Sequence, residues 1–429
     1  MSVLGRLRYL SLVLPLACAE PGDAVEDDTD APSSADVTTG SDDAGDNNET
    51  GEVVEDAQYL AVGILRMPEG RSGYGTVLNT LGSDAVIDLS QSGVFPGLGS
   101  LGAADDPDGE FFVGVAESPL IQRYATNDDG TVTKTGELSV LPFGSISGAG
   151  FMSIVDESKG YLFSYLSQSI IVFDPSEMVL VEELPVDFNL PAGYNPFFSN
   201  VALRDGNRIV MATLGVRSDA VVYPKTRAVI LDTDTNEITY AEQEGCGGLT
   251  WAVKDADGNL HFGPLLRIAA SILTDTAGED PTKSCIVSMR AGASAFDDGL
   301  TDLLQLAGRP VGSLVPGPGN LAYVMAMSED APEVTPESAP LLNLSENWTY
   351  NAIDLTNPVE LTPVAGFEDV SGYPISYSVL EAGNDAPTPF LVRVSGDFAE
   401  STIFDVSDPA NPVERYTAPG SAVAVFRLR

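Results

Sequence analysis

The chain has 429 residues and a formal net charge of −42, from 63 acidic and 21 basic side chains. An acidic excess of this size argues strongly against nucleic-acid binding, because phosphate backbones are held by basic surfaces. It also argues against an electrostatic hold on an anionic membrane. Solubility and self-repulsion are its general effects, and attraction of cations or basic partners is the sharper alternative.

The first residues have the pattern of an export signal. Two arginines precede the apolar run 9–17 (YLSLVLPLA), which is too short to span a membrane. The sequence PLAC at 15–18 resembles the lipobox of bacterial lipoproteins, in which the signal is cut before a cysteine that carries the lipid, although Pro15 stands where leucine is usual. We expect residues 1–17 to be a lipoprotein signal peptide and Cys18 to be lipidated. Ordinary cleavage that leaves Cys18 free is the alternative.

An acidic spacer follows the signal. Residues 19–56 contain EDDTD and SDDAGDNNET and have no lysine, arginine or aromatic side chain. Such a stretch cannot bury enough apolar surface to offset its ordering entropy. We therefore expect residues 18–57 to be a disordered tether and residues 58–429 to be the folded domain. A lipid, a solvated spacer and a folded body are the arrangement of a protein whose only membrane contact is its anchor.

Residues 58–429 repeat one pattern: an apolar run, a tight acidic or glycine turn, a second apolar run, then a hairpin with a polar tip. The tips lie at Thr80, Asn127, Asp174, Asp232, Arg290, Asp354 and Asp405, which gives seven units. Repeats of about 40–50 residues made of four short strands are typical of β-propellers. We predict an all-β fold, a seven-bladed β-propeller, with six or eight blades as alternatives.

The first hairpin of each unit has the stronger turn residues, such as Asp-Gly, Pro-Gly and Gly-Asn. These turns are expected at 106–109, 156–160, 204–207, 254–259 and 316–320. The run 422–428 (AVAVFRL) is typical of an innermost strand, and the run 59–67 (YLAVGILRM) of a second strand without a first. Pairing the two runs would close the ring and remove an open sheet edge.

The links opposite the hairpin turns are expected to form the binding face. The longest of them are 215–226, 264–284 and 328–348, in three consecutive blades, and long loops gathered on one face are where binding usually occurs. Trp251 and Arg309 follow blade-to-blade links and could approach the central channel. Both are candidates for the ligand face, with Arg309 as an anion contact. An arginine that braces a loop through carbonyl groups is the alternative.

Cys246 and Cys285 are the two cysteines that remain after Cys18. An even pair in an exported chain favours a disulfide, which would close a loop of about 40 residues and stabilise the fold by at most about 4 kcal/mol. Both should lie toward the long-link face, where the bridge would clamp the link 264–284. A lone reactive thiol is the alternative.

The chain has a single histidine, His261, in an apolar strand, where a place in the core or wall is expected. One histidine cannot form a multi-histidine zinc site, and no Gly-x-Ser-x-Gly elbow accompanies it. The segments 232–236 and 255–259 resemble the start of calcium loops but depart from the EF-hand spacing, so turn formation explains them. We predict no cofactor and no metal, and leave open a calcium site built from other carboxylates and carbonyls.

Three segments carry a family resemblance: QSIIVFDPSEMVLVEELPV at 168–186, EGCGG at 244–248 with SCIVSM at 284–289, and GRPVGSLVPGPGNLAYV at 308–324. Through them, residues 118–429 resemble the lipoproteins of myxobacterial siderophore (myxochelin-type) gene clusters and, more distantly, the Bacteroidetes propeller lipoproteins of iron-uptake loci. The resemblance implies a seven-bladed propeller at the bacterial outer membrane with a role beside siderophore uptake. It supplies no catalytic residues.

The sequence therefore favours a lipid-anchored binding module of the cell envelope, periplasmic or surface-exposed, which we expect to be a monomer. Its expected partner is an outer-membrane receptor or a small ligand such as an iron–siderophore. The alternative is a periplasmic propeller enzyme of the lactonase or quinoprotein type, with a carboxylate-bound metal in the channel. Propellers host both kinds of activity, so the fold alone does not decide.

Overall fold

The computed structural model describes residues 59–427 except for short gaps at 68–69, 79–80, 82–84, 88, 90–91, 96–97, 104–108, 116–117, 128, 145–149, 165, 200, 219–220, 275–281, 344, 373–378, 382–388 and 396–398. The chain divides into two units, Met1–Asp56 and Ala57–Arg429, and the described residues all belong to the second. The predicted signal peptide, Cys18 and the whole of the predicted tether lie outside them. None of the helices within the described ranges is long and apolar enough to cross a bilayer.

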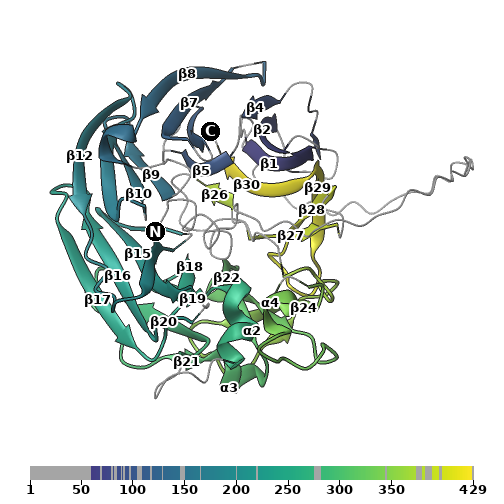
Figure 1. The fold of residues 1–429 in the computed structure, drawn as a ribbon. Helices are drawn as coiled ribbons and strands as arrows, with labels where there is room; N and C mark the ends of the chain where they lie inside the picture. The colour runs from purple at the N-terminus through teal and green to yellow at the C-terminus, as the bar shows by residue number, and fades with distance from the viewer. Residues whose placement is uncertain are drawn as a thin grey trace, which may run out of the picture. The chain divides into compact units, whose positions relative to one another are not determined.

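Seven sheets, antiparallel except for two short parallel pairs, follow one another around a ring, so the predicted seven-bladed β-propeller is confirmed (Figure 1). Five blades are continuous in sequence, and their strands are as follows. Blade 2 has β5 (Leu98–Ala103), β6 (Glu110–Val115), β7 (Leu120–Thr126) and β8 (Val132–Ser139), and blade 3 has β9 (Gly150–Asp156), β10 (Lys159–Ser164), β11 (Ser169–Asp174) and β12 (Val179–Pro185). Blade 4 has β13 (Tyr194–Phe198) and β14 (Leu203–Asp205), both paired with β15 (Arg208–Arg217), then β16 (Lys225–Asp232) and β17 (Ile238–Glu244). Blade 5 has β18 (Leu249–Lys254), β19 (Leu260–Pro264), β20 (Cys285–Met289) and β21 (Thr301–Asp302), and blade 6 has β22 (Val311–Pro316), β23 (Leu321–Met327), β24 (Trp348–Asp354) and β25 (Thr362–Pro363).

Blades 1 and 7 join the two ends of the domain. Blade 1 has β30 (Ser421–Arg427), β1 (Tyr59–Met67), β2 (Gly70–Leu78) and β4 (Gly93–Phe95), with β26 (Val379–Glu381) parallel to β30. The pairing expected of the two terminal runs is present, because β1 and β30 are antiparallel with Leu60 opposite Phe426. Blade 7 has β27 (Phe390–Val394), β28 (Glu400–Asp405), β29 (Val413–Pro419) and, from the start of the domain, β3 (Ala85–Val86).

The predicted hairpin that begins at Tyr74 is wrong in its second half. The repeat predicts a hairpin over 74–90 (YGTVLNTLGSDAVIDLS) with its tip at Thr80, which lies outside the described residues. Strand β2 pairs with β4 instead, and β3 pairs in parallel with β29, with Ala85 opposite Tyr416. A segment of two paired residues has no alternation from which a partner or register can be read. The N-terminal part of the domain therefore contributes strands to two blades.

Aspartates end one strand in each of four blades and shape the turns that follow, as the repeat predicted. Asp174, Asp232, Asp354 and Asp405 are each the last residue of their strand. Each carboxylate accepts a hydrogen bond from a backbone N–H two or three residues later, at 2.8–2.9 Å. These short local bonds fix the turn. The pKa of all four carboxyl groups lies below its ordinary value, mainly through backbone hydrogen bonds for Asp174 and Asp232, the Thr356 hydroxyl for Asp354 and the Arg415 side chain for Asp405.

The apolar core lies between neighbouring blades. One cluster joins Ala228 and Ile230 of blade 4 to Leu260, Phe262 and Val287 of blade 5. Because strand residues alternate between faces, their neighbours in blade 5 point the other way, into a second cluster shared with blade 6. Short helices lie in the connections: η1 (Leu141–Phe143), α2 (Leu266–Thr274), α3 (Leu303–Ala307) and α4 (Ala339–Leu342).

Candidate functional site

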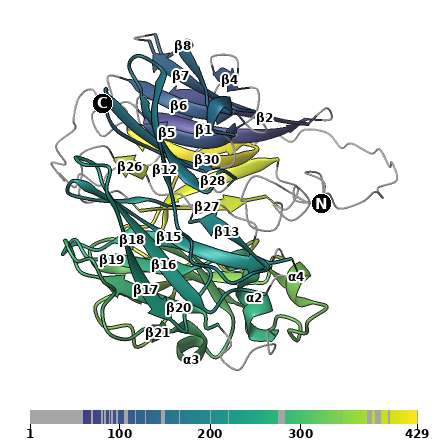
Figure 2. The same cartoon turned by 60° about the vertical axis from the view of Figure 1, so that its left-hand side comes forward.

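The three long links gather on one side of the domain, as expected, and two of them contain helices. Helix α2 belongs to the link 264–284 and α4 to the link 328–348, and the two lie side by side in both ribbon views (Figures 1 and 2). Asn343 locks them together: its Oδ1 accepts from the backbone N–H of Ala270 at 2.8 Å, and its Nδ2 donates to Ser271 Oγ at 3.2 Å. We call the described residues of the three links the long-link surface.

The first link, 215–226, is joined to the others through the segment that contains the EGCGG run. Gly248 has a left-handed φ of +71°, and a Cβ there would press on Val222 of the first link and Ile268 of α2. Thr226 Oγ1 donates to the carbonyl of Cys246 at 2.7 Å. Gly248 is thus needed because three chain segments meet there.

Cys246 and Cys285 form the predicted disulfide. Their Cα atoms lie 6.0 Å apart, and both residues are fully buried. Cys285 is the first residue of β20 and Cys246 precedes β18, so the bridge spans the link that contains α2. The bridge therefore ties the end of that link, at Cys285, to the segment that precedes β18.

The two residues predicted for the ligand face occupy different surroundings. Trp251 lies on β18 and packs, half-buried, against the apolar cluster between blades 5 and 6. Arg309 lies between α3 and β22, and its Nη1 is 3.5 Å from Oε1 of the exposed Glu329 on the link 328–348. Trp251 Nε1 and Arg309 Nε are both buried and without a hydrogen-bond partner in the part of the chain that is described. Neither residue lines the hollow presented below.

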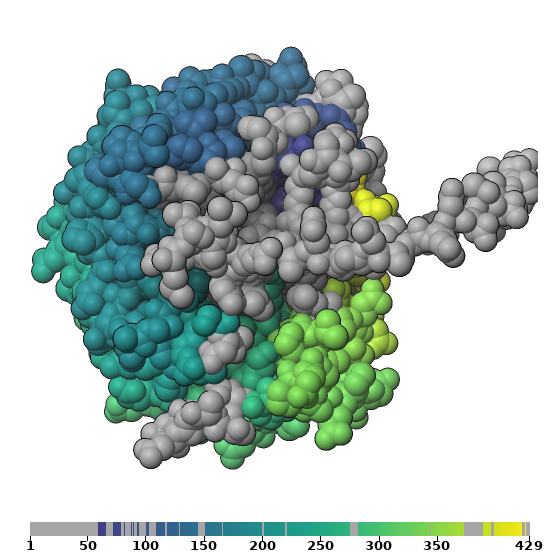
Figure 3. All heavy atoms as spheres, in the orientation of Figure 1, coloured from purple at the N-terminus to yellow at the C-terminus, as the bar shows by residue number. Residues whose placement is uncertain are grey.

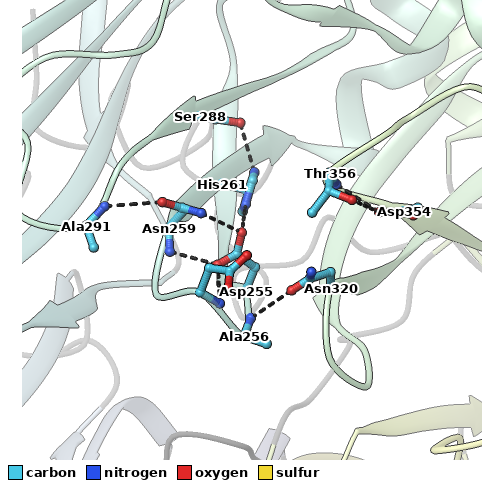
Figure 4. A network of polar contacts seen from close by, with 10 residues as sticks. Asp255, Ala256, Asn259, His261, Ser288, Ala291, Asn320, Asp354 and Thr356 are labelled. Atoms are coloured by element: carbon cyan, nitrogen blue, oxygen red, sulfur yellow. Dashed lines mark hydrogen bonds and ion pairs between the residues drawn. The ribbon is translucent and has the colours of Figure 1, made fainter.

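The single histidine is the centre of a buried polar network in blade 5 (Figure 4). His261 lies on β19 directly opposite Ser288 of β20, and its Nδ1 is 2.8 Å from Ser288 Oγ. Its Nε2 is 2.9 Å from Oδ2 of Asp255, which follows β18. With a neutral ring, Nε2–H donates to the carboxylate and Nδ1 accepts from the hydroxyl. The imidazole thus connects the turn after β18 to β19 and β20 of the same blade.

Asp255 is held as a carboxylate by the same network. Burial alone would raise its pKa, but hydrogen bonds from His261 and Asn259 outweigh that effect and lower the pKa. Asn259 donates twice, from its backbone N at 2.8 Å and from Nδ2 at 3.0 Å. Asn320 of blade 6 accepts from the backbone N–H of Ala256 at 3.1 Å, so the next blade holds the same turn.

In space, Asp255, His261 and Ser288 are arranged like the acid, base and nucleophile of a catalytic triad. The sequence alone did not indicate this array. Aspartate and histidine flank a single turn, and the serine is their cross-strand neighbour, so only the register of blade 5 brings them together. In nucleophilic catalysis the serine needs a substrate pocket and oxyanion donors beside it. Ser288 lies within a regular strand and is half-buried. The arrangement as it stands fastens the hairpins of blade 5.

A hollow between blade 4 and the connection from β12 to β13 is the second feature that the sequence did not reveal. It encloses about 220 Å³ of space, including open solvent, and lies where the link 215–226 meets the connection from β12 to β13. Its polar lining includes Lys225 and Arg227 of β16 with Glu242 of β17, and its apolar lining includes Phe188 and Tyr223. The sequence shows its two bases at alternate positions of one strand, but it does not show the connection that lies over them.

Acidic side chains do not converge into a metal site within the described ranges. No group of three or more histidine, cysteine, aspartate or glutamate side chains there could hold an ion. The segments 232–236 and 255–259, which resemble the start of calcium loops, use Asp232 and Asp255 to accept hydrogen bonds from their own turns.

No protein-family model matches the sequence, and no curated protein matches it. Solved structures do match in fold. A "putative 6-phosphogluconolactonase" from Bacteroides uniformis has 11% identity and a TM-score of 0.53, covering 87% of this chain and 99% of that one. A "hypothetical selenium-binding protein" from Sulfolobus tokodaii has 9% identity and a TM-score of 0.52, covering 87% and 93%. A protein from Lactobacillus plantarum has 12% identity and a TM-score of 0.51, covering 87% and 100%. Similarity at this level is a similarity of propeller fold.

Proposed function

We propose that this protein is a lipid-anchored propeller of the bacterial cell envelope that binds a partner through its long-link surface. The observation that supports this proposal most directly is that helices α2 and α4 pack against each other. The link that contains α2 is bridged by the disulfide between Cys246 and Cys285, and the two helices are joined through Asn343. Interfaces form readily on surfaces that are already rigid, because little entropy is lost on binding.

Apolar side chains on these helices support the same proposal. Leu273 at the end of α2 is 41% exposed and Leu341 of α4 is 75% exposed. The segment around α4 projects on the face seen in Figure 3, where it is light green. Exposed leucines on adjacent, fixed helices are a feature of protein-binding surfaces. Acidic residues, including Glu329, Glu333 and Glu337, are exposed on the same link and favour a basic rim on the partner.

The partner we propose is an outer-membrane receptor for an iron–siderophore, or the iron–siderophore itself. Support for this choice comes from the resemblance of the segments 168–186, 244–248 and 308–324 to siderophore-cluster lipoproteins. The strongly acidic chain is compatible with attraction of a cationic or metal-bearing ligand. Lipidation of Cys18 would keep the domain at the membrane where such a receptor is found.

Growth under iron limitation tests this proposal. A strain without the gene should grow poorly on its siderophore as iron source, and the wild-type gene should restore growth. The double variant Leu273→Asp/Leu341→Asp should not restore it, because charges would be placed in the interface. Leu141→Asp, at a leucine that is 65% exposed on η1, is the matched control and should restore growth. Normal siderophore use by the deletion strain would contradict the iron proposal.

The anchor has its own test. Export of the wild-type chain should be sensitive to globomycin and should give a form that partitions into detergent. Cys18→Ala should give a form that partitions into the aqueous phase. Equal partitioning of the two proteins would contradict lipidation.

One observation favours an enzyme as the second candidate, namely the array of Asp255, His261 and Ser288. In a lactonase, Ser288 Oγ would attack the lactone carbonyl carbon while His261 takes its proton and Asp255 stabilises the imidazolium. The ring C–O bond would then break as His261 returns the proton to the leaving alkoxide, and water activated by His261 would hydrolyse the ester on Ser288. Turnover of a lactone by the wild type that is absent from Ser288→Ala would favour this reading. The binding proposal expects neither protein to exceed the rate in buffer.

A further inference from the structure

We propose that the outer edge of β12 accepts an added β-strand from a partner protein, an extended segment with apolar and basic side chains. Strand β12 ends the sheet order β12-β11-β10-β9 of blade 3 and lies on the outer rim of the ring (Figure 1). Within the described ranges only β11 pairs with it. The backbone N–H and C=O groups on the other side of such a strand can pair with another chain. This edge belongs to blade 3, so the inference goes beyond the proposed role of the long-link surface.

Strand β29 of blade 7 has the same design as β12. Both strands have seven residues, begin with a valine and end with a proline, over Val179–Pro185 and Val413–Pro419. In each, the pairing with the neighbouring strand skips the third residue, which is Val181 in β12 and Arg415 in β29. The two strands therefore contain a β-bulge at the same position, and they can be compared residue by residue.

The edge of β29 already carries an added strand. Strand β3 runs parallel to it, with Ala85 opposite Tyr416 and Val86 opposite Thr417, directly after the bulge. Bulges often protect a sheet edge from pairing, but this one does not. Glu182 and Glu183 occupy the corresponding places in β12, and no strand lies opposite them in the part of the chain that is described. The chain covers this edge in blade 7 and leaves it open in blade 3.

The other outer strands are less suited to strand addition. Strands β4, β21 and β25 have only two or three residues, and a short edge strand is a common protection. Strand β8 is longer but has Lys134 near its middle, which is another protection. Strand β17 exposes no large apolar side chain. In β12, by contrast, Val179 is 49% and Val181 is 57% exposed, and apolar side chains of an added strand can pack beside them.

The charge of the edge indicates the kind of strand that it accepts. Glu182 and Glu183 are exposed, and each is held in place by a neighbour: Asn236 Nδ2 donates to Glu182 Oε1, and Ser169 Oγ donates to Glu183 Oε1 at 2.7 Å. A second copy of this acidic chain would place like charges together, and so would its own residues 19–56, which have no lysine or arginine. Lysine or arginine on a partner segment would complement both carboxylates.

A short fluorescein-labelled peptide of alternating lysine and valine is the probe for anisotropy titrations of the full-length protein. The comparison peptide has the same sequence with its central backbone nitrogens methylated, so it keeps the charge and the apolar side chains but lacks the backbone donors. We expect the unmethylated peptide to bind at least about tenfold more tightly, because backbone hydrogen bonds supply the affinity in strand addition. Equal binding of the two peptides would leave only a general attraction to an acidic protein and would overturn the proposal.

Matched variants place the interaction on one strand. Val181→Lys should weaken binding of the unmethylated peptide by about tenfold or more, because a lysine on an edge opposes pairing. Val413→Lys adds the same charge at an exposed valine of β29, whose edge β3 occupies, and should not change binding. Equal effects of the two lysine variants would contradict a site on β12.

Hydrogen exchange of the wild type gives the same information without a variant. The unmethylated peptide should slow amide exchange within 179–184 and should leave exchange within 413–418 unchanged. Protection only at other strands would overturn the assignment to β12. The double variant Leu273→Asp/Leu341→Asp should bind the peptide as the wild type does, so this test and the growth test of the long-link surface can fail independently.

Discussion

Nε2 of His261 lies 2.9 Å from Oδ2 of Asp255, so the chain's single imidazole closes the same hairpin that the aspartate shapes. Three further groups donate to this carboxylate: the backbone N–H groups of Asp257 and Asn259 and the Asn259 side chain. A carboxylate with so many donors can be buried without a basic partner. The contact therefore sets the turn and joins it to the strand that carries His261.

Removing this carboxylate should destabilise the domain more than removing a similar one at the surface. Asp255→Ala leaves several buried donors unsatisfied, and we expect a loss of about 3 kcal/mol in the free energy of unfolding. Ser288→Ala leaves one ring nitrogen without its donor and should cost about 1–2 kcal/mol. Urea unfolding of the two variants and the wild type measures both losses in the free energy of unfolding.

The control for this series is Asp354→Ala, which removes a carboxylate that also accepts hydrogen bonds from its own turn, but from an exposed site in blade 6. Its cost should be smaller than that of Asp255→Ala because water can satisfy the freed N–H groups. If the two alanine variants unfold at the same urea concentration, the His261 network does not stabilise the fold.

Acid should weaken the fold through Asp405. Burial alone would raise its pKa, but hydrogen bonds from Arg415 and Ser407 lower it below the ordinary value of 3.8. A group with a lower pKa in the folded state stabilises that state above the unfolded pKa, and the contribution is lost as pH falls through the folded pKa. The loss is thus expected below about pH 4.

Urea midpoints of the wild type and Asp405→Asn at pH 7, 5, 4 and 3 check this expectation. Protonation also reduces the self-repulsion of so acidic a chain, which acts in the opposite direction. The informative quantity is therefore the difference between the two proteins, which should narrow as pH falls from 5 to 3. A constant difference would show that the ionised form of Asp405 does not support the fold.

Reduction of the disulfide should act on blade 5 first. Cys246 and Cys285 are 39 positions apart, for which the chain-entropy relation gives about 4 kcal/mol at most. We expect Cys246→Ser/Cys285→Ser to lower the unfolding free energy by about 2–4 kcal/mol. Limited proteolysis should then cleave within 264–284 earlier than in the wild type. Equal electrophoretic mobility of the two oxidised proteins would contradict the bridge.

Local chemistry explains which parts of the fold could be predicted from sequence. Asp174 and Asp405 marked hairpin tips because their hydrogen bonds reach only two or three residues along the chain. The runs 59–67 and 422–428 could be paired because each had one strand edge without a predicted partner, and pairing the two edges closes the ring. The partner of Ala85 in β29 could not be read, since a two-residue segment has no pattern and its partner is far away in sequence.

The candidate sites show the same limit. Cys246 and Cys285 could be paired by elimination, but Asp255 and His261 were noticed separately, because their relation to Ser288 depends on the register of β19 and β20. The hollow at Lys225 depends on the connection from β12 to β13 folding over β16, which no local pattern specifies. Sites that depend on strand register or on connections between blades require the structure.

Ring closure gives the last prediction, at Gly420. This residue joins β29 to β30 with a φ of +72°, and a Cβ there would overlap the carbonyl oxygen of Ile64 on β1. Gly420→Ala adds this clash to the cost of a left-handed alanine, so we expect a loss of about 2–4 kcal/mol in the free energy of unfolding.

Gly292→Ala separates the two contributions, because Gly292 has a φ of +74° but nothing within 4 Å of an added Cβ. That variant should lose only about 1 kcal/mol, the cost of the backbone conformation alone. Urea unfolding of both variants gives the difference, which reports how closely β30 must approach β1 for the ring to close. Equal losses would mean that the junction at Gly420 can relax and that the two terminal strands are not tightly joined there.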